Sequence, residues 1–123
     1  MTVQIYMYCI YAEDIPSAVE FYANVLGLHQ DTQIEGSPHF QVGESYLVIQ
    51  KGHPPAHTPA AHLPVLALSV EDMDLVIERL EQNNISLVSG IEEHEDSRWI
   101  KFFDPAGNLI EVIEFYPTLM FGP

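Results

Sequence analysis

The sequence predicts an α+β fold made of two βαβββ modules, and three observations indicate it. A strand followed directly by an aspartate-capped helix occurs twice, starting at residues 3 and 63. The two capping residues, Asp14 and Asp72, are 58 positions apart, and their neighbours keep that offset. Three short strand patterns follow each helix. A single module of this kind cannot bury its sheet alone, so the two modules are expected to pair.

The first module is expected to span residues 1–51. Residues 3–11 alternate as a strand with apolar residues on both faces, which predicts that both faces are covered. Asp14 then caps a helix with Pro16 in its first turn, and Gly27 ends it. The remaining strands are predicted at residues 28–32, 39–42 and 46–51.

A Pro-rich linker at residues 52–62 leads into the second module, residues 63–116. After a strand at 63–70, Asp72 caps a helix that Asn83 and Asn84 end. The other strands of this module are predicted at residues 85–91, 99–103 and 109–115, followed by an apolar tail at 117–123. The 123 residues are therefore predicted to form one domain.

The turn between the last two strands contains Asp104-Pro105-Ala106-Gly107-Asn108. Proline presets its φ for the turn, and glycine or asparagine takes a positive φ. The strand that follows has an apolar face interrupted by one carboxylate, Glu111. An acid in that position requires a metal, a cationic partner, a proton or access to water.

Composition limits the partners of the chain. Its net charge is −14, from 18 acidic residues against four basic ones. Phosphate backbones and anionic membranes would repel such a chain, so we expect no nucleic acid and no membrane as partner, while a cationic small molecule would be attracted. The alternative is that the acids only keep the protein soluble. No apolar run reaches the length of a membrane span, no signal peptide is recognised, and the single Cys9 predicts a reducing, cytoplasmic location.

These two modules, the segment DIPSAVEFYANVLGL at 14–28 and the segment DPAGNLIE at 104–111 resemble the glyoxalase / bleomycin-resistance / extradiol-dioxygenase superfamily, also called vicinal oxygen chelate proteins. The resemblance covers residues 3–116. It implies that the modules pair into a cupped mixed β-sheet with the helices on its outer face. It also implies a cleft between the paired modules. We expect a homodimer, because an open sheet edge or cleft is commonly buried against a second copy of the chain.

In metal-dependent members of that superfamily, four strands each supply one ligand to a divalent ion. The resemblance puts Met7, Val65 and Glu111 at three of these positions, and Gln50 or Val48 at the fourth. A thioether and an aliphatic side chain cannot hold a hard cation, and one carboxylate does not hold Ni²⁺, Zn²⁺, Fe²⁺ or Mn²⁺ tightly. We therefore expect no cofactor, with a divalent metal at Glu111 as the alternative.

The candidate ligand-binding residues face the expected cleft. Glu111 would anchor a cationic or hydrogen-bonding ligand, or it is a relic paired with Lys101, Arg98 or water. An apolar pocket would be lined by Met7, Cys9, Val65 and Ala67, with Trp99 or Phe102 as aromatic walls and Gln50 as a polar contact; the alternative is ordinary core. His53, His57 and His62 are expected to be solvated residues of the linker.

Two functional hypotheses follow. The first is a metal-independent protein of the bleomycin-resistance type, which sequesters a small cationic or aromatic molecule. The second is a metal-dependent glyoxalase-like lyase or isomerase that uses Glu111. A small structural or regulatory module without a ligand is a third possibility.

Overall fold

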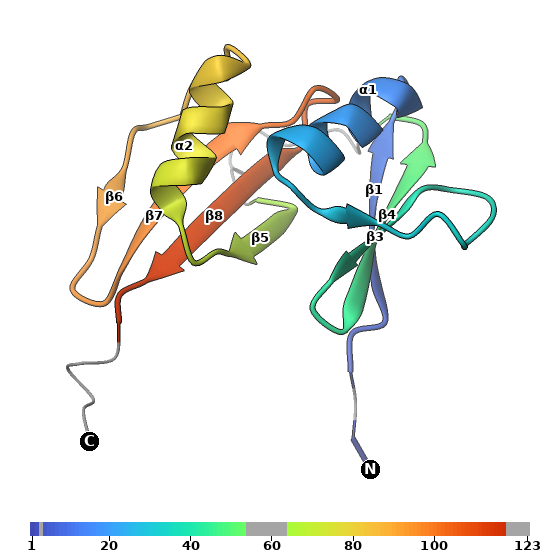
Figure 1. The fold of residues 1–123 in the computed structure, drawn as a ribbon, viewed down its shortest axis with the longest axis horizontal. Helices are drawn as coiled ribbons and strands as arrows, with labels where there is room; N and C mark the ends of the chain where they lie inside the picture. Colours follow the sequence, from blue (N-terminus) through green and yellow to red (C-terminus); the bar gives the residue numbers. More distant parts are fainter. Residues whose placement is uncertain (3, 54–63, 118–123) are drawn as a thin grey trace. The chain divides into compact units, whose positions relative to one another are not determined.

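The computed structural model describes every residue except 3, 54–63 and 118–123, and it divides into two compact units. The first unit contains residues 1–61 and the turn 104–108, and the second contains 62–103 and 109–123. Each unit has one four-stranded mixed sheet and one helical segment, so the predicted α+β class is confirmed (Figure 1). No helix among the described residues is long and apolar enough to cross a membrane.

The first sheet has the strand order β1-β4-β3-β2. Strand β1 (Met7–Ala12) runs parallel to β4 (Ser45–Lys51). Strand β3 (His39–Val42) is antiparallel to β4, and the short β2 (His29–Gln30) closes the other edge. The predicted strand 39–42 is confirmed at both ends.

The helical segment of the first unit begins as α1 (Ile15–Glu20) and continues as a π-helix, η1 (Phe21–Val25). The side chain of Asp14 accepts a hydrogen bond from the Ser17 N–H at 3.1 Å, which satisfies one of the free donors at the helix start. Gly27 ends the segment with a φ of 77°, as the sequence predicted.

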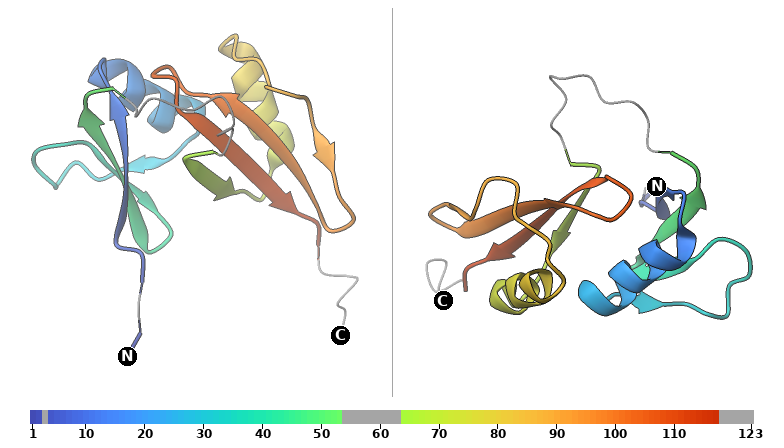
Figure 2. Two further views of the ribbon diagram at one scale, coloured as in Figure 1. Left: turned by 180° about the vertical axis from the view of Figure 1, so that it is seen from behind. Right: turned by 90° about the horizontal axis from the view of Figure 1, so that it is seen from above.

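The second sheet repeats this topology with the order β5-β8-β7-β6. Its strands are β5 (Leu66–Ser69), β6 (Glu92–Glu93), β7 (Ser97–Phe103) and β8 (Leu109–Phe115). Helix α2 (Met73–Gln82) lies on one side of this sheet, as the views in Figure 2 show. Asp72 caps α2 through the Leu75 N–H at 3.1 Å, which is the same bond that Asp14 makes in the first unit.

The two helical segments differ by one residue. The Ile85 N–H returns five residues to the Leu80 carbonyl, whereas the Leu28 N–H returns six residues to the Tyr22 carbonyl. An inserted residue of this kind is what a π-helical turn accommodates. The π-helical turn at the end of the first helical segment therefore accommodates the extra residue, and the two modules keep the same topology.

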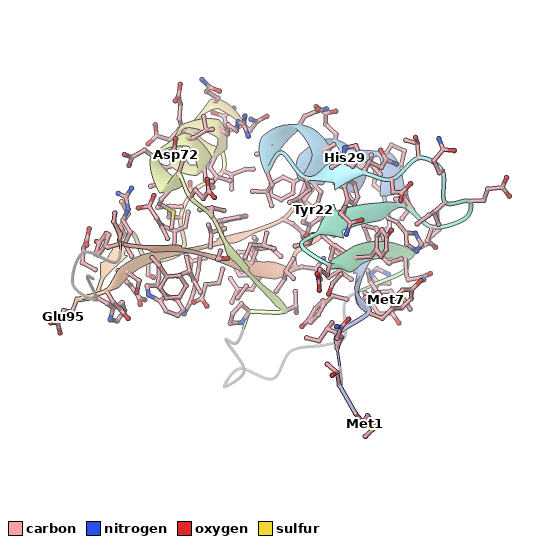
Figure 3. All side chains as sticks on the ribbon, turned by 60° about the horizontal axis from the view of Figure 1, so that its bottom comes forward. Met1, Met7, Tyr22, His29, Asp72 and Glu95 are labelled. Atoms are coloured by element: carbon pink, nitrogen blue, oxygen red, sulfur yellow. The ribbon has the colours of Figure 1, made fainter. Side chains whose placement is uncertain are left out.

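Each sheet buries the face that its helix covers. The first sheet buries Ile10, Phe40 and Ile49 there, and the second buries Ile100, Phe102 and Val112. In the first unit, Tyr22 lies between the helical segment and the sheet, whereas Met7 lies on the opposite side of the sheet (Figure 3). The helix-covered face of each sheet is thus part of a packed core.

The turn 104–108 packs within the first unit. The buried Asp104 carboxylate accepts hydrogen bonds from the Tyr22 hydroxyl at 2.8 Å and from the Asn108 side-chain amide at 2.9 Å. It also accepts the N–H groups of Ala106 and Asn108, and the Asn108 amide donates to the Tyr11 carbonyl. Burial, with Asp104 as a second cause, strongly raises the pKa of the Tyr22 hydroxyl, so that hydroxyl stays protonated and donates.

Several predicted boundaries were wrong. Residues 85–91 form no strand; Gly90 adopts a φ of 76°, and the strand paired with β7 is reduced to Glu92–Glu93. A single backbone bond, from the Val88 N–H to the Lys101 carbonyl, remains where a longer ladder was expected. The first strand begins at Met7, and residues 4–6 precede it. The predicted linker histidines His57 and His62, and the tail from residue 118, lie outside the described residues.

Candidate functional site

Each sheet has a face turned away from its helix, which we call its open face. Strand alternation and the pairing register assign residues to it. The open face of the first sheet carries Met7, Cys9, Tyr11, His39, Gln41, Tyr46, Val48 and Gln50. The open face of the second sheet carries Ala67, Ser69, Ser97, Trp99, Lys101, Phe103, Leu109, Glu111, Ile113 and Phe115, with Val65 just before β5.

The first open face exposes residues that the sequence placed in a cleft or in the core. Met7 is 45% exposed and Cys9 is also exposed, so ordinary core packing is wrong for these two residues. Val48 is buried, and the Gln50 side-chain oxygen accepts a hydrogen bond from the Ser37 hydroxyl at 3.2 Å. The sequence-predicted Met7, Cys9 and Gln50 therefore do share one surface.

Sequence reasoning missed an aromatic cluster on this face. The Tyr46 ring meets the Tyr6 ring at 6.2 Å and the His39 ring at 5.6 Å, both edge to face. The Tyr46 hydroxyl donates to the Asp31 carboxylate at 3.4 Å. No local sequence pattern indicated this cluster, because Tyr46 and His39 lie on different strands and Tyr6 lies just before β1.

The second open face carries Glu111 in a mostly apolar setting. Its carboxylate lies 3.9 Å from the Lys101 ammonium, and the two side chains are 12% and 30% exposed. Arg98 lies on the other face, where it donates to Glu114 at 2.8 Å and to Asp74 at 3.0 Å. Of the cationic partners considered for Glu111, the structure selects Lys101.

Trp99 lies on the same open face as Lys101, one alternation away along β7. Its indole N–H donates to the Ser97 hydroxyl at 2.7 Å, which fixes the orientation of the ring. The other aromatic wall considered, Phe102, is fully buried on the helix-covered face. Trp99 is therefore the aromatic candidate that the structure places beside the charged pair, and Phe102 was wrong.

The register identifies the first-sheet counterpart of Glu111. Cys9 pairs with Val48 in the first sheet, and Ala67, its repeat at an offset of 58, pairs with Glu111 in the second. Val48 thus occupies the place of Glu111, and Gln50 lies two residues further along the strand. The sequence left open whether Gln50 or Val48 is the counterpart of Glu111, and the register identifies Val48.

The residues at the four expected ligand positions do not fit a divalent metal. Met7 offers a thioether, Val48 and Val65 offer no donor atom, and the Glu111 carboxylate faces an ammonium group. Among the described residues, no three His, Cys, Asp or Glu side chains are grouped so as to hold a metal ion. The donor set therefore does not suit Lewis-acid chemistry at these positions.

A hollow lies in the first unit, beside the start of α1. It has a volume of about 260 Å³ and is lined by Glu13, Asp14, Ser17, Ala18, His53, Pro105 and Ala106. His53 pairs with Glu13 at 2.8 Å, and both side chains are largely exposed. This solvated pair agrees with the expected role of His53 as a linker residue.

The fold defines a protein of two repeated βαβββ modules, each with one open sheet face. Residues 4–112 match the family described as Glyoxalase/Bleomycin resistance protein/Dioxygenase superfamily, and the chain belongs to this superfamily. A search of curated proteins finds no match.

Solved structures share the fold. A glyoxalase/dioxygenase from Nostoc punctiforme has a TM-score of 0.79 at 18% identity, covering 93% of this chain and 92% of that one. TnmS3, an antibiotic binding protein from Streptomyces sp. CB03234, has a TM-score of 0.75 at 21% identity, covering 94% and 98%. A lactoylglutathione lyase from Agrobacterium tumefaciens has a TM-score of 0.66 at 25% identity, covering 92% and 94%.

Proposed function

We propose that this protein binds a small aromatic molecule on the open faces of its sheets and that it does so without a divalent metal. The observation that carries the proposal is the Lys101–Glu111 pair. The one carboxylate at an expected ligand position already faces a cation at 3.9 Å, and the other positions hold Met7, Val48 and Val65. A metal ion at Glu111 would have to displace that ammonium with no second strong ligand to help it.

Two further observations support a binding role. Exposed aromatic and apolar side chains on the open faces, including Tyr11 and Phe103, offer contact area that a flat ring can cover. TnmS3, which has this fold, is described as an antibiotic binding protein. Of the two ligand types expected from the sequence, we favour the aromatic one, because Glu111 is not a free carboxylate awaiting a cation.

A metal-dependent lyase or isomerase remains the second candidate. Its support is the half-buried carboxylate of Glu111, together with the likeness to a lactoylglutathione lyase at 25% identity. Such an enzyme would need further ligands from residues other than Met7, Val48 and Val65.

Thermal unfolding in added Ni²⁺, Zn²⁺, Mn²⁺ and Fe²⁺ separates the two candidates. A metal present at 100 times its Kd would stabilise the folded protein by about 2.7 kcal/mol and raise Tm by several degrees. We expect that no metal raises Tm through Glu111. Glu111→Ala tests this, and Glu44→Ala, which removes an exposed acid, is the control. A rise that Glu111→Ala abolishes and Glu44→Ala preserves would overturn the proposal in favour of the enzyme.

We also infer a homodimer in a reducing, cytoplasmic setting. In each sheet an edge is formed by a parallel strand, β1 or β5, and β1 carries exposed side chains such as Met7 and Tyr8. Edge strands of this kind are usually protected by further pairing. Light scattering after size exclusion tests the dimer; a mass of 13.9 kDa at all concentrations would contradict it.

A further inference from the structure

We propose that Lys101 and Glu111 together hold one uncharged polar group of the ligand, an amide or hydroxyl that both donates and accepts hydrogen bonds, with the attached aromatic ring against Trp99. The inference rests on the proposed function and names the chemical class that its site would take.

The first step is the length of the ion pair. The Lys101 ammonium and the Glu111 carboxylate are 3.9 Å apart, beyond the length of a hydrogen bond. Within the described part of the chain, no hydrogen bond involves either of these two side-chain groups. Three N–H donors and the carboxylate lone pairs therefore remain available to a ligand.

The second step is the setting of the pair. Along β7, Lys101 lies between Trp99 and Phe103, and along β8, Glu111 lies between Leu109 and Ile113 on the same face. Polar contacts count for more where apolar side chains exclude water. The pair is also the one place on this open face, among the described residues of β5, β7 and β8, where opposite charges meet.

The third step is the sign of the charge. An anionic ligand group would gain from Lys101 and lose from Glu111, and a cationic group would do the reverse. A group without net charge that accepts from the ammonium and donates to the carboxylate gains from both. The strongly acidic chain therefore does not require a cationic ligand at this position, because the local pair is neutral.

The fourth step is the ring. Trp99 is on the same strand and face as Lys101, and its N–H is held by Ser97 at 2.7 Å, so its ring is pre-positioned. A flat ring bearing the polar group can lie against the indole while the group reaches the pair.

Three probes with one ring system test this inference: 2-naphthamide, 2-naphthoate and 2-naphthylmethylammonium. Trp99 is the single tryptophan of the chain, so its indole N–H signal in a ¹H–¹⁵N NMR spectrum reports directly on this face. We expect 2-naphthamide to shift that signal at the lowest concentration of the three. Lys101→Met and Glu111→Gln should each weaken its binding about tenfold or more.

Matched controls are Lys51→Met and Glu44→Gln, which make the same charge changes at exposed positions of the first unit and should leave binding unchanged. Tighter binding of 2-naphthoate, strengthened by Glu111→Gln, would overturn the inference in favour of an anion site. Tighter binding of the ammonium probe, strengthened by Lys101→Met, would overturn it in favour of a cation site.

Two other outcomes also overturn the inference: no probe shifts the indole signal, or the signal moves with protein concentration alone, because a second copy then covers the face. Neither outcome is a failure of the proposed function, which fails instead if a metal stabilises the protein through Glu111. Because the probe ranking is measured on the unchanged protein, the test does not depend on how the variants fold.

Discussion

The two sheets have the same topology, yet they differ in the row of residues at the centre of their open faces. In the first sheet this row is Cys9, Val48 and His39, and in the second it is Ala67, Glu111 and Lys101. The topology is the same in both sheets, although one row carries an ion pair and the other does not. The Lys101–Glu111 pair is therefore not needed to build a βαβββ module, and it is available for binding.

The largest expected effect comes from moving the carboxylate into the first sheet. Val48 is 1% exposed, so Val48→Glu buries a charge without a cation opposite it. We expect a loss of about 4 kcal/mol in the free energy of unfolding, measured by urea denaturation. The reverse change, Glu111→Val, should cost less than about 1 kcal/mol, since the native pair is long and partly exposed.

The double variant Val48→Glu, His39→Lys sharpens this test. His39 pairs with Val48 as Lys101 pairs with Glu111, so a lysine there should recover part of the loss. A Val48→Glu variant as stable as the unchanged protein would show that the two rows are equally tolerant and would remove the contrast between them.

Local patterns in the sequence were enough for much of the fold. Both aspartate caps, the left-handed Gly27 after the first helix and the strand 109–115 were predicted, because each depends on neighbours within a few residues. The superfamily was also identified correctly, and Glu111 was recognised as an acid that needed a partner.

What could not be predicted depends on contacts between distant residues. The choice of Lys101 over Arg98, and of Val48 over Gln50 as the counterpart of Glu111, follows from cross-strand register. Strand 85–91 failed for a related reason: its apolar residues suit a strand, but Gly90 takes a positive φ and the pairing moves to residues 92–93. The π-helical insertion in the first helix has no local signal in the sequence.

The next largest effect concerns the turns between the antiparallel strands. Gly43 and Glu44 suffice between β3 and β4, whereas residues 104–108 join β7 to β8 and bury Asp104. Asp104→Ala leaves the buried Tyr22 hydroxyl without this acceptor and removes one of the two acceptors of the Asn108 side-chain amide, and we expect a loss of about 3 kcal/mol in urea unfolding.

Glu44→Ala is the matched control in the short turn and should change stability by less than about 0.5 kcal/mol. Equal losses in the free energy of unfolding for the two substitutions would contradict the view that the longer turn stabilises the fold while the shorter one only links two strands.

A third contrast lies at the helix starts. In the second unit, Glu114 accepts the Met73 N–H at 2.8 Å and the Arg98 guanidinium at 2.8 Å, while its register counterpart in the first sheet is the exposed Lys51. The bond from Arg98, followed by the bond from Met73, lowers the pKa of Glu114 below its ordinary value of 4.5. We expect Glu114→Gln to cost about 2 kcal/mol at neutral pH.

The sign of the pH dependence follows from that lowered pKa. A carboxyl group whose folded-state pKa is depressed stabilises the protein above its unfolded pKa and loses this contribution as the pH falls through the folded value. The stability gap between the unchanged protein and Glu114→Gln should therefore narrow below pH 4.5. Urea unfolding at a series of pH values measures it, and a gap that widens in acid would refute the assignment.

The smallest expected effect concerns the N-terminal caps of the two helices, where the two units should behave alike. Asp14 and Asp72 make the same 3.1 Å bond to the third residue after them, so their replacement by alanine should cost about 1 kcal/mol each, and by asparagine much less. The π-helical insertion lies after α1, beyond the reach of the cap, and should not change this cost. Urea unfolding measures both losses in the free energy of unfolding. A markedly larger loss for Asp14→Ala than for Asp72→Ala would mean that the first helical segment relies more on its N-terminal cap. The inserted residue would then destabilise that segment relative to the regular helix α2.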